Sequence, residues 1–274
     1  MNPIFNISPG DINSEHISLF GEVSNEGFSY FFLNDKSKLI EGLTVFHFDK
    51  RKTENNVSEL LITIFSEQLL LKNKYSNIFI SYAFNESILT PGIYYNHSQN
   101  NENINLVYGD LNNGVIFADS VEEKNLYNIY RIHADIHQAI TGQFSEAKFS
   151  HQYSLLVKQL PDTGNIMKVI FYQNKIVITL LKNDKLQIVQ AFYYTTAGDV
   201  VYHMVNICDQ FQVEEVRVEL GGMIEKDSGL FKEIHKYFLM ISFSDLPDNL
   251  SYDEGIMEFP SHFFSHLFSI ALCV

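Results

Sequence analysis

The feature that most constrains the fold is an order of predicted elements that occurs twice along the chain. The first copy has strands at residues 16–23, 27–35 and 42–49, a helix at 56–73 and a strand at 76–84. The second copy has strands at residues 165–172, 175–182 and 186–195, a helix at 197–211 and a strand at 213–220. The copies start about 150 residues apart and share a pattern rather than residue identities. We therefore expect an internally duplicated α/β protein.

Turn residues support both copies. The first two strands flank the short turn "SNE", which a glycine follows, and this is typical of a β-hairpin. The corresponding strands of the second copy meet at the two-residue turn Gln173-Asn174. The segment "PDTG" at 161–164 is typical of a boundary. We therefore predict two domains, residues 1–161 and residues 162–274.

Further elements lie between the copies. The run 87–95 is a predicted strand broken at Pro91, and the Asn-rich run 96–105 is predicted to be a polar, mobile loop. Strands at 114–121 and 125–133 and a helix at 134–144 are predicted to follow.

Composition narrows the choice of partners. The 274 residues are 46% hydrophobic and 19% charged, which provides for a packed interior. The formal net charge of −14 and the lack of a basic stripe exclude nucleic acid and anionic membrane surfaces as expected partners. No signal peptide and no apolar run of about 18 residues is found, so a cytoplasmic protein without a membrane span is expected. Cys208 and Cys273 fit no metal spacing and are expected to be buried thiols.

Four segments carry a resemblance to a known family: "SILTPGIYY", "NLYNIYRIHADIHQAI", "AKFSHQYSLLVKQL" and "FFSHLFSIALCV". With them the chain resembles, over nearly its whole length, the Bacteroidota family called domain of unknown function 3822. The duplicated pattern also resembles the ribonuclease H-like units of the actin-like ATPase superfamily, which includes sugar kinases, chaperones and actin. The resemblance implies an α/β fold of two ribonuclease H-like subdomains in an actin-like ATPase arrangement, with mixed sheets flanked by helices. It implies no established activity.

In active members of that superfamily, the hairpin turns wrap the phosphates of a nucleotide and supply glycines, hydroxyls and a metal-binding aspartate. The first turn here, Gly21 to Gly27, carries Glu22 and Glu26 without a basic neighbour, and Leu19-Phe20-Gly21 stands where Asp-x-Gly is wanted. The second turn has no glycine and no aspartate. Because phosphates need convergent N–H donors and a compensating cation, both phosphate loops are predicted to be degenerate.

A glycine pair follows the last strand of the second copy, where it is predicted to form a turn. By position, Gly221 and Gly222 match the superfamily turn that packs against the adenosine of a nucleotide, and Met223 could lie along a base or sugar. Ser228 is predicted to cap the helix that follows. Glycine pairs also serve any sharply turning strand, so the alternative to a nucleotide contact is a simple turn.

Other polar clusters have plainer interpretations. His133 and His137 are four residues apart, as are His262 and His266, but a zinc site needs at least three protein ligands. We expect partly packed helix faces at both pairs. Glu215 and Glu219 share a predicted strand face with Arg217, which is expected to neutralise them.

The sequence favours a non-catalytic interaction or scaffold module, with an unidentified protein partner or a homodimer and no cofactor or metal. The alternative is a nucleotide-binding ATPase or kinase-like protein with an unconventional ATP and Mg²⁺ site in the interdomain cleft. In that case Gly221, Gly222 and Met223 bind the cofactor, and Asp49 or Asp119 replaces the missing metal aspartate. A cleft that binds a small molecule without turnover is a third hypothesis.

Overall fold

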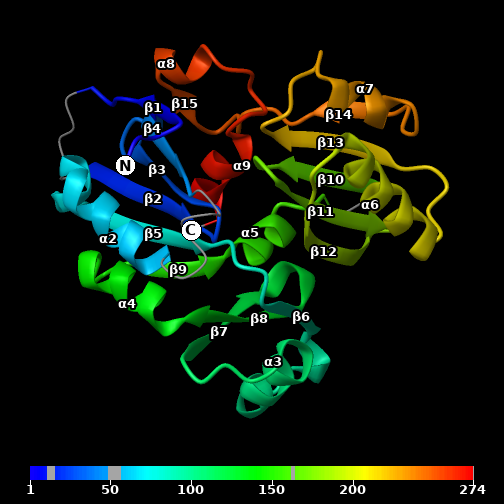
Figure 1. Cartoon of the computed structure of the whole chain (residues 1–274), viewed down its shortest axis with the longest axis horizontal. Coiled ribbons are helices and arrows are strands. Elements are labelled where there is room, and N and C mark those ends of the chain that lie inside the picture. Colours follow the sequence, from blue (N-terminus) through cyan, green and yellow to red (C-terminus); the bar gives the residue numbers. More distant parts are fainter. Residues whose placement is uncertain (11–15, 49–56, 162–163, 274) are drawn as a thin grey trace. The chain divides into compact units, whose positions relative to one another are not determined.

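The computed structural model describes residues 1–10, 16–48, 57–161 and 164–273. The chain divides into two compact units (Figure 1). Unit 1 contains Met1–Lys158, Asp248–Glu258 and Cys273–Val274, and unit 2 contains Gln159–Pro247 and Phe259–Leu272. Residues 162 and 163, beside the predicted domain boundary, lie outside the described residues.

Unit 1 is built on a mixed sheet. Its strands lie in the order β1 (Phe5–Ile7), β4 (Leu39–His47), β3 (Gly27–Asn34), β2 (Ile17–Val23), β5 (Asn77–Tyr82) and β9 (Lys148–His151), with β15 (Ser251–Tyr252) also paired to β4. Strands β2, β3 and β4 are antiparallel to their neighbours in this group, whereas β5 is parallel to β2 and β9 is parallel to β5.

Unit 2 repeats this arrangement. Its strands lie in the order β12 (Lys185–Tyr193), β11 (Lys175–Lys182), β10 (Ile166–Phe171), β13 (Arg217–Gly222) and β14 (Ile241–Phe243). The first three strands are again antiparallel, β13 is parallel to β10 and β14 is parallel to β13. Leaving aside β1 and β15, both sheets therefore order their strands third, second, first, fourth and fifth along the chain, with matching directions. The predicted duplication is confirmed at the level of topology.

Two helices form the core of unit 1 with the sheet. Helices α2 (Val57–Glu67) and α4 (Ala134–Gln143) contact each other and lie side by side in Figure 1. Leu61 and Ile64 of α2 and Ile140 of α4 are fully buried among the apolar side chains of β2, β3 and β4. The predicted helix 56–73 ends early, because the chain becomes extended at Gln68 before a short 3-10 turn, η2 (Leu69–Lys72).

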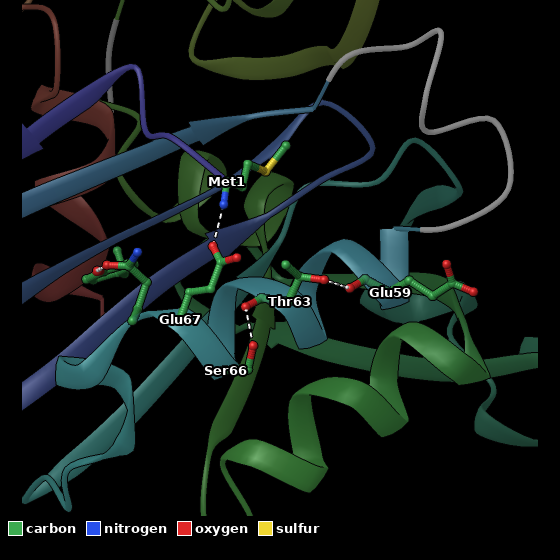
Figure 2. Close-up of polar contacts among 7 residues, drawn as sticks. Met1, Glu59, Thr63, Ser66 and Glu67 are labelled. Atoms are coloured by element: carbon green, nitrogen blue, oxygen red, sulfur yellow. Dashed lines mark hydrogen bonds and ion pairs between the residues drawn. The ribbon is translucent and has the colours of Figure 1, made fainter.

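Two side-chain hydroxyls of α2 donate hydrogen bonds to carbonyl oxygens of the same helix, as Figure 2 shows. The hydroxyl of Thr63 donates to the carbonyl oxygen of Glu59 at 2.9 Å, and the hydroxyl of Ser66 donates to that of Thr63 at 2.7 Å. The α-amino group of Met1 contacts the carboxylate of Glu67 at the end of the helix. These bonds satisfy polar side chains within the helix surface itself.

A small insert follows β5 in unit 1. It is an antiparallel sheet of β6 (Ser87–Pro91), β8 (Leu126–His133) and β7 (Gly114–Val121), together with α3 (Asn100–Tyr108) and the 3-10 turns η3 (Gly92–Tyr94), η4 (His97–Gln99) and η5 (Glu122–Lys124). We call residues 87–133 the insert. In Figure 1 it carries α3 on its far side from β9.

The prediction of a mobile loop at 96–105 is wrong. The side chain of Asn96 accepts a hydrogen bond from the N–H of Ser98 and caps η4, and α3 follows directly. Ile104 is fully buried, and the buried guanidinium of Arg131 donates to the side chain of Asn105 at 2.7 Å. The buried side chains of Asn100 and Ile104 and a contact with a distant arginine thus outweigh the polar composition of this segment.

The remaining helices complete the two units. Helix α5 (Gln152–Lys158) follows β9, and α8 (Glu254–Met257) contacts β4. In unit 2, α6 (Ala197–Gln210) and α7 (Gly229–His235) pack on the sheet through Val200, Met204, Ile207 and Ile234. Thr196 and Asp199 form a capping box at the start of α6, and the Ser228 hydroxyl accepts from the N–H of Phe231, which confirms the predicted cap of α7. Helix α9 (Ser265–Phe268) and η6 (Ser269–Leu272) end the unit.

Candidate nucleotide site

The first hairpin turn uses its own hydrogen-bonding groups. The N–H of Ser24 donates to the carbonyl oxygen of Gly27 at 2.9 Å, and the Ser24 hydroxyl accepts from the N–H of Glu26 at 3.1 Å. A Cβ atom on Gly27 would lie 2.2 Å from the carbonyl oxygen of Phe46, so this glycine permits close strand packing. The turn is therefore closed by internal bonds that an anion would have to replace.

Two carboxylates are buried at this turn. Glu22 is 7% exposed and Glu26 is 6% exposed. One carboxylate oxygen of Glu22 accepts a hydrogen bond of 3.1 Å from the side-chain amide of Gln152, which is also buried, at the start of α5. Carboxylates at low dielectric repel a phosphate more strongly than they would in water. The contact of Gln152 with Glu22 was not predicted, and the only signal for it in the sequence is the position of Gln152 after a short strand.

The second hairpin turn is as tight as predicted. The N–H of Tyr172 donates to the carbonyl oxygen of Lys175 at 2.8 Å across the residues Gln173 and Asn174. Lys175 is only 1% exposed, and its ammonium group lies 5.0 Å from the centre of the Tyr172 ring. This geometry is typical of a cation–π contact. Nothing in the sequence indicates that this cation, which directly follows the turn, is buried.

The glycine pair lies within β13 rather than in a turn after it. Gly221 and Gly222 pair with Ile170 and Phe171 of β10. Gly222 has φ +80°, and a Cβ there would lie 2.2 Å from the carbonyl oxygen of Phe171. Only glycine fits such a backbone without strain. The predicted strand 213–220 is correspondingly displaced, since β13 begins at Arg217.

The backbone N–H of Gly222 is bonded to the C-terminal segment of unit 2. The N–H of Gly222 donates to the carbonyl oxygen of His262 at 2.7 Å, and the N–H of Met223 donates to that of Phe171 at 2.8 Å. The His262 ring is buried, with Nε2 at 2.7 Å from the carbonyl oxygen of Ile224. The strand geometry and these bonds account for Gly222. Nucleotide contact by Gly221, Gly222 and Met223 stays a prediction.

His266 lies one helical turn after His262, in α9. Its ring centre is 5.3 Å from that of Tyr172, and within the described chain its Nδ1 is buried without a hydrogen-bond partner. Burial lowers the pKa of His266 to about 3, because the charged imidazolium would lose its hydration. This histidine is therefore neutral throughout the physiological range.

Asp119, one of the two proposed metal aspartates, holds together elements of unit 1. Its Oδ2 accepts from the hydroxyls of Ser150 and Ser154 and from the N–H of His151, at 2.6 to 2.8 Å. Its Oδ1 accepts from the hydroxyl of Tyr130 at 3.2 Å. Four donors thus engage the carboxylate that a metal would need. Asp49, the other candidate, lies outside the described residues.

Only one histidine of the pair His133 and His137 lies within α4. His133 precedes the first turn of α4, whereas His137 lies within it, with Nδ1 at 2.7 Å from the hydroxyl of Tyr82. Burial lowers the pKa of His137. Across the described parts of the chain, no group of three or more His, Cys, Asp or Glu residues is placed to hold a metal ion.

Glu219 is ion-paired, but its partner differs from the predicted Arg217. The ammonium of Lys168 lies 3.1 Å from the Glu219 carboxylate, because the two residues are paired across β10 and β13. Glu215 lies in the loop before β13 rather than on the strand. The two cysteines form no disulfide, and Cys208 is buried whereas Cys273 is half-buried.

The fold and these hairpins define an α/β protein of the actin-like ATPase fold. A Bacteroides thetaiotaomicron protein with an actin-like ATPase fold and unknown function is similar over 97% of this chain and 100% of its own, with a TM-score of 0.79 and 18% identity. A structure of the PilM-PilN type IV pilus biogenesis complex is similar over 93% of this chain and 98% of the matched chain, with a TM-score of 0.62 and 10% identity.

The family follows from the sequence. The family model described as protein of unknown function, DUF3822, matches residues 10–241, so the chain belongs to this family. No curated protein matches the chain. Among the helices of the described residues, none combines the length and the apolar character needed to cross a membrane.

Proposed function

We propose that this protein is a non-catalytic interaction module built on an actin-like fold whose phosphate-binding hairpins have become degenerate. The observation that carries the proposal is the burial of Glu22 and Glu26 at the first hairpin turn, with Glu22 bound by Gln152. A triphosphate brought to this turn would meet negative charge and amides that are already bonded. The tight second turn supports the same conclusion.

The insert offers the surface for such a role. Leu106 is 86% exposed on α3, and Val107 beside it and Ile93 and Tyr94 of η3 are also exposed. Four exposed large apolar side chains on one small subdomain make it a candidate interaction surface. The PilM-PilN structure shows a protein of this fold in a named complex, and an assembly role for this chain is an analogy at the level of fold. The partner is a second protein or a second copy of this chain.

A nucleotide-binding function is the second candidate. It rests on the position of the glycine pair at the end of β13, the place that the resemblance to the actin-like superfamily associates with the adenosine contact. In this alternative, ATP with Mg²⁺ binds at Gly221, Gly222 and Met223. We also place the interaction module in the cytoplasm, which the lack of a disulfide between Cys208 and Cys273 supports.

A thermal unfolding series separates the two functions. A ligand at about 100 times its dissociation constant stabilises a fold by about 2.7 kcal/mol. We expect no change in melting temperature with ATP or ADP at about 1 mM, with or without Mg²⁺. A Mg²⁺-dependent increase would instead support a nucleotide site.

A second experiment tests the interaction role. The tagged full-length protein is cross-linked in its native cells, alongside the variant Leu106→Ser and the control Leu69→Ser. Leu69 is 75% exposed on η2, so the control removes an apolar side chain of the same kind elsewhere. We expect a specific cross-linked species, either a heteromer or a homodimer, that Leu106→Ser reduces and Leu69→Ser retains. A species unaffected by both variants would contradict the use of the insert.

A further inference from the structure

Unit 2 has a groove that none of the preceding roles uses. It is a hollow of about 920 Å³ between the C-terminal end of α6, the loop that leads to β13 and the segment that follows α7. A second hollow of about 310 Å³ continues along α6. Val205, Asp209 and Tyr237 line both hollows, so the two form one surface feature. We call it the α6–α7 groove.

The groove has an apolar floor and exposed apolar walls. Cys208, Val213, Val216 and Phe238 line it and are buried parts of the core of unit 2. On the walls, Leu239 is 83% exposed, and Tyr237 and Met240 are exposed as well. Tyr202 extends the apolar surface into the smaller hollow. Apolar side chains held open around a concave surface are typical of a binding groove.

The charge around the groove has one sign. Asp209, Glu214 and Glu215 line the larger hollow, and Glu233 lines the smaller one. No Lys, Arg or His is among the described residues that line either hollow. Glu233 is paired with Lys236 at 2.5 Å, whereas the other three carboxylates form no ion pair with any described residue. The groove therefore presents uncompensated negative charge beside apolar surface.

We propose that the α6–α7 groove binds a short segment of a partner protein that carries Lys or Arg beside large apolar side chains. The apolar side chains of the segment would cover the floor and Leu239, and its cations would meet the rim carboxylates. This inference rests on the proposed interaction function but uses a different surface from the insert.

A second copy of this chain does not suit the groove. In a twofold-symmetric dimer the same patch faces itself, so the carboxylates of Glu214 and Glu215 would approach their own equivalents. The formal net charge of −14 adds to this repulsion. Nucleic acids and anionic lipids are repelled for the same reason. A cationic segment with apolar anchors is the occupant that the charge of the groove attracts.

The experiment uses a library of random 12-residue peptides selected on the full-length protein. The selected peptides are then titrated by fluorescence anisotropy against the double variant Glu214→Lys/Glu215→Lys and against Leu239→Ser. The matched controls are Glu254→Lys/Glu258→Lys, which makes the same change of charge at exposed positions in and beside α8, and Leu69→Ser. Circular dichroism and urea unfolding verify that each variant folds.

We expect the selected peptides to be enriched in Lys or Arg next to Leu, Phe, Tyr or Trp. The double charge variant should weaken their binding roughly tenfold or more, Leu239→Ser should also weaken it, and the controls should leave it within about twofold. Raising the salt concentration should weaken binding to the wild type. Selection of no peptide, of peptides without basic residues, or of peptides insensitive to the groove variants would overturn the inference. Such a result would leave the proposed function standing, because the nucleotide series and the insert variants test it independently.

Discussion

The backbone N–H of Gly222 donates a 2.7 Å hydrogen bond to the carbonyl oxygen of His262, forty residues later in the chain. The bond links the end of β13 to the segment that precedes α9. The N–H of Gly222 is therefore already bonded within the protein and is not open to a ligand. The same glycine has a positive φ and close contact with Phe171, so its smallness has a structural cause.

Gly222→Ala should therefore lower the free energy of unfolding by about 2–4 kcal/mol, because alanine is strained at positive φ and its Cβ would meet the Phe171 carbonyl oxygen at 2.2 Å. Urea unfolding measures the change. Gly229→Ala is the control, since no atom lies within 4 Å of the added Cβ in α7, and it should be neutral or slightly stabilising. Equal effects of the two substitutions would show that strain at Gly222 is small.

Much of the fold could be predicted because apolar periodicity is local information. The apolar runs at residues 114–121 and 175–182 predict strands with the same bounds as β7 and β11. The start of β13 was misplaced because Val213 and Val216 pack into the core from a loop, which alternation alone cannot distinguish from a strand. Helix α3 was missed because its stability depends on Arg131, far along the chain.

The site was harder to predict, since its decisive contacts join distant residues. The sequence identified Glu22 and Glu26 as unfavourable for phosphate, but not that Gln152 binds Glu22, because 130 residues separate the two side chains. Nothing near Gly222 in the sequence indicates that the carbonyl group of His262 is its partner. The sequence near Asp119 likewise does not indicate the two serines that donate to its carboxylate in the folded protein. Its role in structure was therefore not predicted, and metal binding was proposed for it instead.

Asp119→Asn should lower the free energy of unfolding by about 2–4 kcal/mol. The aspartate accepts from Ser150, His151, Ser154 and Tyr130, and an amide would replace one accepting oxygen with a donor that faces these donors. Asp110→Asn, at an exposed position in the same subdomain, is the control and should change the value by no more than about 0.5 kcal/mol. If both variants unfold at the same urea concentration, Asp119 does not hold β7 to the start of α5.

His266 should make the protein less stable in acid. Its pKa is about 3 in the folded state against an ordinary 6.5, so as the pH falls the unfolded chain binds the proton first. The stability from the neutral ring is present above pH 6.5 and is lost progressively between pH 6.5 and pH 3. At pH 5 the loss should be about 2 kcal/mol relative to neutral pH.

The measurement is the difference in unfolding free energy between pH 7.5 and pH 5 for the wild type and for His266→Gln. The variant should lack about 2 kcal/mol of the wild-type difference, and the exposed histidine variant His235→Gln should retain it. An undiminished pH dependence in His266→Gln would mean that His266 does not titrate with a lowered pKa.

The thiol of Cys208 should react slowly with alkylating reagents. Burial raises its pKa to about 11 from an ordinary 9.0, with the neighbouring charge of Asp209 adding to the effect, and only the thiolate is nucleophilic. At pH 8 the thiolate fraction is lowered about 100-fold, so alkylation by iodoacetamide should be slower by a similar factor than for the unfolded chain in urea. With Cys273→Ser as the background, mass spectrometry follows Cys208 alone.

The rate of alkylation of Cys208 should rise about tenfold per pH unit from pH 7 to pH 10, because the thiolate fraction grows in that proportion below the pKa. A plateau near pH 9 would instead place the thiol in contact with water and would require the floor of the α6–α7 groove to open in solution.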